Sequence, residues 1–134
     1  MISIVVDRVS PEPVYEQVAR QIRDRIASGK LMPGSVLPSV RTLASDLGVN
    51  LNTVARAYRL LEEEGFLGIR ERSGAVVLPP PSAPAAFASS LLRRDLREVL
   101  ARMRQSGVHP DDLRRIVSRE IDSLTEVKKP RGGS

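Results

Sequence analysis

The stretch that decides the fold is residues 37–61, LPSVRTLASDLGVNLNTVARAYRLL. Apolar residues recur at three- and four-residue spacing in each half, so each half is predicted to be a helix with one buried face. A tight turn at residues 48–50 joins the halves. This pattern is typical of a helix-turn-helix, whose second helix enters the DNA major groove by its N-terminal residues. The apolar positions are Val40, Leu43, Ala44 and Leu47, then Val54, Ala57, Tyr58 and Leu61.

Polar side chains gather at the start of the second predicted helix. Asn50, Asn52 and Thr53 are short groups able to reach base edges or phosphates, and Arg56 follows one turn later. Arg56 is placed to reach a backbone phosphate or a groove edge. The periodicity by itself leaves an alternative open, in which the same two helices form a hairpin inside an ordinary core.

Motifs on both sides extend the pattern. PVYEQ at residues 13–17 precedes it, and LEEEGFL at residues 61–67 follows. With these motifs, residues 11–78 resemble the GntR family of bacterial transcription regulators. The tail resembles the YtrA subfamily, which carries a short helical dimerisation segment in place of a large effector domain. The resemblance implies a mainly α (α+β) winged helix-turn-helix fold that binds double-stranded DNA.

The same resemblance implies roles for individual residues. In the family, the Arg of the Leu-Pro-Ser-x-Arg motif, here Arg41, reaches DNA and often a guanine edge, which suits the fork of a guanidinium. Ser39 is expected to cap the following helix, with a phosphate contact as the alternative. Asn52 and Thr53 match family positions that contact DNA. Leu51 departs from the Arg or Pro of relatives, so either it touches a thymine methyl or base readout shifts to its neighbours.

Two β-like runs, residues 66–70 and 75–78, predict a hairpin that serves as the wing beside DNA. Arg70 and Arg72 are predicted phosphate contacts. Gly74 matches the second of two family glycines and would let the backbone approach the duplex closely. Arg72 takes the place of the first glycine.

Residues 13–28 are predicted to form a helix that buries Val14, Val18, Ile22 and Ile26, with Ser10 as its start signal and Gly29 as its stop. Tyr15 is interpreted first as a packing residue and second as a phosphate contact. Residues 2–6 are read as an edge strand or a docked arm, and a poorly ordered terminus is the alternative.

The tail begins with a stiff, extended linker at residues 79–85, which is too rich in proline for a helix or a central strand. Residues 86–127 carry two apolar helical stripes that cannot cover each other fully, so they are predicted to dimerise. Residues 128–134 are read as a disordered basic end, and residues 1–78 as the DNA-binding domain. The predicted dimerisation residues are Leu92, Leu96, Val99, Leu100, Met103, Leu113, Ile116, Val117, Ile121 and Leu124.

The composition argues against several other classes. The chain has no cysteine and one histidine, His109, and it has no Gly-rich phosphate loop. We therefore expect no metal site, no cofactor and no enzyme activity. No apolar run reaches the length of about 20 residues needed to span a bilayer, and the N-terminus lacks a signal-peptide pattern, so a cytoplasmic location is expected. The net charge is +5, but residues 1–78 contain ten Lys or Arg and nine Asp or Glu. Charge alone does not identify DNA as the partner.

The leading hypothesis is a dimeric repressor that binds a pseudo-palindromic operator, with half-sites about 10 bp or a multiple apart. An unidentified small molecule is a possible effector, and activation instead of repression stays open. Two alternatives remain: a sequence-indifferent architectural DNA binder, and a protein-interaction module that uses the helix-turn-helix as scaffold.

Overall fold

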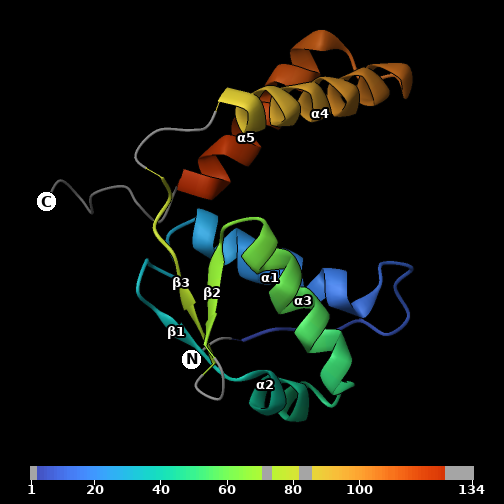
Figure 1. Cartoon of the computed structure of the whole chain (residues 1–134). Coiled ribbons are helices and arrows are strands. Elements are labelled where there is room, and N and C mark those ends of the chain that lie inside the picture. Colours follow the sequence, from blue (N-terminus) through green and yellow to red (C-terminus); the bar gives the residue numbers. More distant parts are fainter. Residues whose placement is uncertain (1–2, 71–73, 82–85, 126–134) are drawn as a thin grey trace, which may run out of the picture. The chain divides into compact units, whose positions relative to one another are not determined.

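A computed structural model describes residues 3–70, 74–81 and 86–125. The chain divides into two compact units, one ending at Pro80 and the other beginning at Pro81. Figure 1 shows the elements of each unit, which are described separately below.

The first unit is a winged helix-turn-helix. Its helices are α1 (Val14–Ala27), α2 (Val40–Leu47) and α3 (Leu51–Glu63). Its strands β1 (Val36–Leu37), β2 (Leu67–Arg70) and β3 (Gly74–Val77) form an antiparallel sheet in the order β1-β3-β2. The predicted mainly helical fold with a β-hairpin wing is therefore confirmed. Strand β1 was not predicted, because a two-residue strand followed by Pro38 has no period to detect.

The core lies where α1 and α3 meet the sheet. The predicted stripe of α1 is buried at its centre, where Val18 and Ile22 are 0% exposed. The predicted stripe of α3 is buried along its whole length, and its end residues Val54 and Leu61 are both 0% exposed. Val14 and Ile26, at the ends of the α1 stripe, are partly buried against the same cluster. The remaining buried apolar side chains are Ala19, Leu37, Leu43, Ala44, Ala57, Tyr58, Leu67, Ala75 and Val77.

Helix ends follow local side-chain chemistry with one exception. The Ser39 Oγ accepts a hydrogen bond from the Thr42 N–H at 3.1 Å, so Ser39 caps α2 as predicted. Asn50 caps α3 by accepting from the Asn52 N–H at 2.7 Å. The prediction that Ser10 begins α1 is wrong. Its Oγ accepts instead from the Glu12 N–H at 3.1 Å in the preceding turn, and α1 begins after Pro13, without a side-chain cap.

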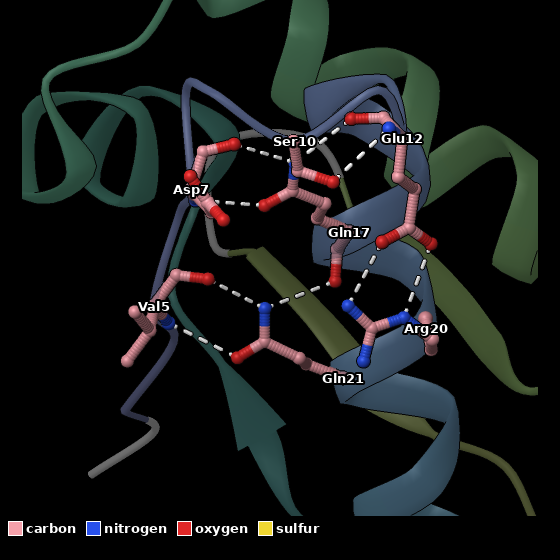
Figure 2. A network of polar contacts seen from close by, with 7 residues as sticks. All are labelled: Val5, Asp7, Ser10, Glu12, Gln17, Arg20 and Gln21. Carbon is pink, nitrogen blue, oxygen red and sulfur yellow. Dashed lines mark hydrogen bonds and ion pairs between the residues drawn. The ribbon is translucent and has the colours of Figure 1, made fainter.

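An extended N-terminal arm, residues 3–9, lies against α1 (Figure 2). The Gln17 side chain accepts from the Asp7 N–H and donates to the Asp7 carbonyl, both at 2.8 Å. One helical turn later, Gln21 pairs in the same way with Val5, at 3.0 and 2.7 Å. Four helical residues advance about 6 Å and two extended residues slightly more, so the two spacings nearly match. The docked-arm prediction for residues 2–6 is confirmed at Val5, and Ile2 lies outside the described residues. The edge-strand alternative is wrong, because side-chain amides take the place of a neighbouring strand.

The second unit consists of α4 (Ala86–Gln105) and α5 (Pro110–Thr125). Between them, the Arg104 Nη1 donates to the Val108 carbonyl at 2.8 Å, and the His109 Nδ1 accepts from the Asp111 N–H at 3.2 Å. Among the residues of this unit whose burial is described, none is fully buried. Across the described chain, no helix is both long enough and apolar enough to cross a membrane.

We expect Gln17→Met to destabilise the first unit by about 1–3 kcal/mol, because it leaves the Asp7 amide and the carbonyls of Asp7 and Glu12 without their partner. Gln17 is 2% exposed, so water cannot easily replace the lost contacts. Urea unfolding followed by tyrosine fluorescence measures this unit alone, because both tyrosines of the chain lie in it.

Gln21→Met is the matched control. It removes the same kind of amide one turn away, where Val5 is 73% exposed and water can take over the hydrogen bonds, so its cost should stay below about 1 kcal/mol. Equal losses for the two variants would contradict the assigned role of Gln17.

Candidate nucleic-acid interface

The N-terminal end of α3 presents the predicted contact residues on one side. Asn50, Asn52 and Arg56 are exposed, and Thr53 is partly exposed. Because Arg56 follows Asn52 by four residues and Thr53 by three, the three side chains share a helix face. With Pro13, which precedes α1, and Val14 and Tyr15 of α1, they line an open hollow of about 460 Å³. The structure thus gathers four predicted residues at one surface.

Arg56 is not simply solvated. The carbon at the centre of its guanidinium lies 3.8 Å from the centre of the Tyr15 ring. The ring is partly buried against the core, as the packing interpretation of Tyr15 expected, and its hydroxyl donates to the Glu16 carboxylate at 3.1 Å. A guanidinium stacked on an aromatic face keeps the N–H donors along its edge available to a ligand.

Arg41 and Ser39 lie at the start of α2, and they differ in whether their polar groups already have partners within the protein. Arg41 is exposed, and its guanidinium makes no hydrogen bond or ion pair with another residue of the described part of the chain. The Ser39 hydroxyl, in contrast, accepts from the Thr42 N–H and donates to the Thr42 hydroxyl at 3.0 Å. Capping uses the Ser39 oxygen as an acceptor, and the contact with the Thr42 hydroxyl uses its proton, so a phosphate contact by Ser39 stays a prediction.

A buried tyrosine links the two helices of the motif. The Tyr58 hydroxyl donates to the Pro38 carbonyl at 2.7 Å, and Tyr58 is 1% exposed. Burial raises the pKa of Tyr58 well above its usual range, so the hydroxyl stays protonated and keeps donating. This bond fixes α3 against the chain segment that leads to Arg41.

Sequence reasoning missed Arg8. Its Nη2 donates to the Gly48 carbonyl at 2.8 Å and approaches the Leu47 carbonyl at 3.4 Å. A positive charge there is favourable, because the carbonyls at the end of α2 carry partial negative charge. Arg8 brings the arm to the turn that precedes α3. A single arginine in an irregular segment carries no periodic or motif signal, so the sequence could not have indicated this contact.

The predicted wing contacts are placed only in part. Arg70 is exposed at the end of β2, whereas Arg72 lies outside the described residues. Gly74 is buried at the start of β3, and a Cβ there would overlap the Leu37 carbonyl oxygen. This packing against β1 is one reason for a glycine at position 74. A close approach of Gly74 to a DNA duplex stays a prediction.

Leu51 is the first residue of α3 and is 42% exposed. An apolar side chain therefore stands among the polar groups at the helix N-terminus. Its surface is available for contact with a thymine methyl, one of the two alternatives that the sequence left open.

Comparison with known proteins identifies the family. Residues 14–77 match the family described as bacterial regulatory proteins, gntR family. The chain is also 41% identical over 85 residues to the HTH-type transcriptional regulator Rv1152 of Mycobacterium tuberculosis, covering 63% of this chain and 70% of that protein. The chain belongs to the GntR family.

Two further similarities reach beyond the winged unit of this GntR chain. The HTH-type transcriptional repressor YtrA of Bacillus subtilis is 31% identical over 111 residues, covering 82% of this chain and 85% of that protein. The structure of YtrA from Sulfolobus acidocaldarius, a GntR-family transcription factor, has 41% identity and a TM-score of 0.59, covering 73% of this chain and 97% of that one. The YtrA-like assignment is confirmed.

One solved relative contains DNA. The structure of AraR(DBD) in complex with operator ORX1 has 27% identity and a TM-score of 0.50, and it covers 57% of this GntR chain and 99% of the AraR chain.

We expect Gly74→Ala to destabilise the first unit by more than about 3 kcal/mol, because the new methyl group forces β3 away from Leu37 in addition to straining a backbone φ of 98°. Gly34→Ala is the control. Its φ of 91° imposes the same kind of strain, but nothing lies within 4 Å of the added carbon, so about 1–2 kcal/mol is expected. Urea unfolding by tyrosine fluorescence compares the two, and equal losses would show that the contact with Leu37 contributes nothing.

Proposed function

We propose that this chain is a sequence-specific transcription regulator that binds operator DNA as a homodimer and acts as a repressor. The observation that carries the proposal is the N-terminal end of α3, where Asn52, Thr53 and Arg56 project together from a rigid core with Arg41 exposed on the adjoining helix. Short amides and hydroxyls suit base edges and phosphates, and arginine suits guanine and phosphate.

The relatives support this function. The AraR domain is seen with its operator, and the Bacillus subtilis YtrA protein is named a transcriptional repressor. In the proposed complex, α3 lies in the major groove, Arg41 reads a base edge and Arg56 contacts the backbone. Repression then requires only that the bound protein occupies DNA that the transcription machinery needs.

The second unit supports the proposal of a homodimer. Its apolar stripe stays open: Leu92 is 67% exposed, Leu96 53% and Ile121 56%. An apolar groove of about 430 Å³ runs between α4 and α5, lined by Leu100, Leu113 and Val117 among others. A unit of this size with so little buried surface is marginal alone, and a second copy of the same helices offers a matching apolar face. Of the predicted dimerisation residues, Leu92, Leu96, Val99, Ile116, Ile121 and Leu124 are exposed, and Leu100, Met103, Leu113 and Val117 are partly buried.

Two winged units held by one dimeric tail would bind two half-sites related by a two-fold axis. Control by a small molecule stays a prediction for which the structure names no ligand.

Binding to DNA from immediately upstream of the protein's own gene, beside a scrambled duplex, tests sequence-specific binding. Fluorescence anisotropy across a salt series should give a preference of about a thousandfold or more at physiological salt. If both duplexes bound equally and salt abolished both interactions together, operators would next be sought among genomic fragments. If none of those were preferred, the architectural alternative would stand instead.

Arg41→Ala should weaken operator binding by about 1–3 kcal/mol and relax the base preference at one position. Lys30→Ala is the charge-matched control. Lys30 follows the C-terminal end of α1, about 20 Å along the helix from the end that borders the α3 surface, and its loss should change little. Unchanged affinity and preference in Arg41→Ala would exclude base readout by Arg41.

Replacing Leu96 or Ile121 by lysine should convert the dimer to a monomer, because a charge would be buried in the apolar contact. Sedimentation equilibrium measures the mass. Gln105→Lys adds the same charge to an exposed position off the α4 stripe and should leave the dimer intact. A wild-type monomer at micromolar concentration, or dimeric Leu96→Lys and Ile121→Lys proteins, would contradict the proposed interface.

A further inference from the structure

The contact between Tyr15 of α1 and Arg56 of α3 indicates a function for a residue that does not itself need to touch DNA. We infer that Tyr15 is a positioning residue that holds the Arg56 guanidinium ready for a DNA backbone phosphate. The inference rests on the proposed DNA binding and adds to it how one contact is prepared in the free protein.

Arg56 is the group that needs to be held. Its long side chain has several rotatable bonds, and fixing them on binding costs affinity. In the described part of the chain no carboxylate or carbonyl accepts a hydrogen bond from Arg56, so the Tyr15 ring is the contact that orients its guanidinium. At 3.8 Å from the ring centre, one flat face of the guanidinium is covered. Its N–H groups lie in the plane, where a phosphate oxygen can accept them.

The Tyr15 ring, which packs against Arg56, is itself held in place by its neighbours. Tyr15 packs partly buried against the core, and its hydroxyl donates to the Glu16 carboxylate. The helix that carries it is anchored by neighbouring residues. Glu12 and Arg20 form a two-point pair at 2.9 and 3.1 Å, and the buried Gln17 binds the arm. Sharing its proton with a carboxylate makes the phenol ring more electron-rich, which strengthens the attraction of a cation to its face.

The position of the pair favours a phosphate over a base. Arg56 lies one helical turn after Asn52, further from the end of α3 that enters the groove, and α1 forms the opposite wall of the hollow. A guanidinium at that depth lies beside the rim of the groove, where the sugar-phosphate backbone runs.

Three substitutions separate the contribution of the Tyr15 ring from that of its hydroxyl, and the planar shape of the Arg56 guanidinium from its charge. Tyr15→Phe keeps the ring, whereas Tyr15→Leu keeps apolar bulk but removes the aromatic face. Arg56→Lys keeps the charge but has no planar group to stack.

The test is a double-mutant cycle with Tyr15→Leu, Arg56→Ala and both together, using the full chain. The probe is a fluorescent 30-bp duplex of scrambled sequence, read by anisotropy across a low-salt series, because a phosphate contact does not depend on sequence. Arg56→Ala should reduce the salt slope by about one. Tyr15→Leu should weaken DNA binding by about two- to tenfold when Arg56 is present. In the Arg56→Ala background it should weaken DNA binding no further. Tyr15→Phe should bind within about twofold of wild type.

Several outcomes would overturn the inference. Equal losses of DNA affinity from Tyr15→Leu with and without Arg56 would show that Tyr15 acts on DNA or on the fold directly. No loss of affinity would show that the stack does not contribute to binding. Tyrosine fluorescence and thermal unfolding check that the variants fold. Should Tyr15→Leu fail to fold, Arg56→Lys replaces it: it should keep the wild-type salt slope and lose about two- to tenfold in affinity, and wild-type affinity would refute the stacking role.

The two hypotheses fail in different ways. A wild-type chain that binds neither the scrambled duplex nor any genomic fragment would refute the proposed function and this inference together. A wild-type chain that binds, with additive losses in the cycle, would refute only the role of Tyr15.

Discussion

The hydrogen bond from the Tyr58 hydroxyl to the Pro38 carbonyl is the constraint on which the candidate interface depends. Tyr58 lies on the buried face of α3, and an unpaired hydroxyl there would cost about 1–3 kcal/mol. The helix therefore packs only where that oxygen meets the segment before α2. Because Pro38 precedes the Ser39 cap by one residue and Arg41 by three, the bond also sets the start of α2. The exposed residues of both helices keep one relative position because of a group buried beneath them.

At the margins of the winged unit, side-chain contacts with backbone atoms take the place of regular secondary structure. Gln17 and Gln21 act toward the arm as a neighbouring strand would, each offering a donor and an acceptor to one extended residue (Figure 2). The arm then carries Arg8 to the carbonyls of the turn before α3. On the other side, the absence of a side chain at Gly74 lets β3 approach β1 at Leu37. The core is thus closed at its margins by contacts whose partners are backbone atoms.

The two units differ in how they are stabilised. The first has side chains that are 0–1% exposed in α1, in α3 and in its sheet, and Leu43 of α2 is 2% exposed. The second has no fully buried residue among those whose burial is described, and its apolar stripe remains accessible. This contrast is why we propose that the first unit recognises DNA and that the second unit mediates assembly. A preorganised surface needs a rigid support, whereas an apolar face left open needs a partner.

The sequence by itself determined the helices of the motif, the cap of α2 at Ser39, the turn at Gly48 and the wing hairpin, because these depend on residues at most a few positions apart. It also indicated Asn50, Asn52, Thr53, Arg41 and Arg56 through motif and periodicity, although their contacts with DNA remain predictions. The tertiary structure alone decided what lies beside them. The ring of Tyr15 under Arg56, Arg8 on the Gly48 carbonyl and Leu37 against Gly74 join residues that are distant in the chain. Such pairings leave no period in the sequence, since they exist only after α1 has packed on α3, the arm on α1 and β1 on β3.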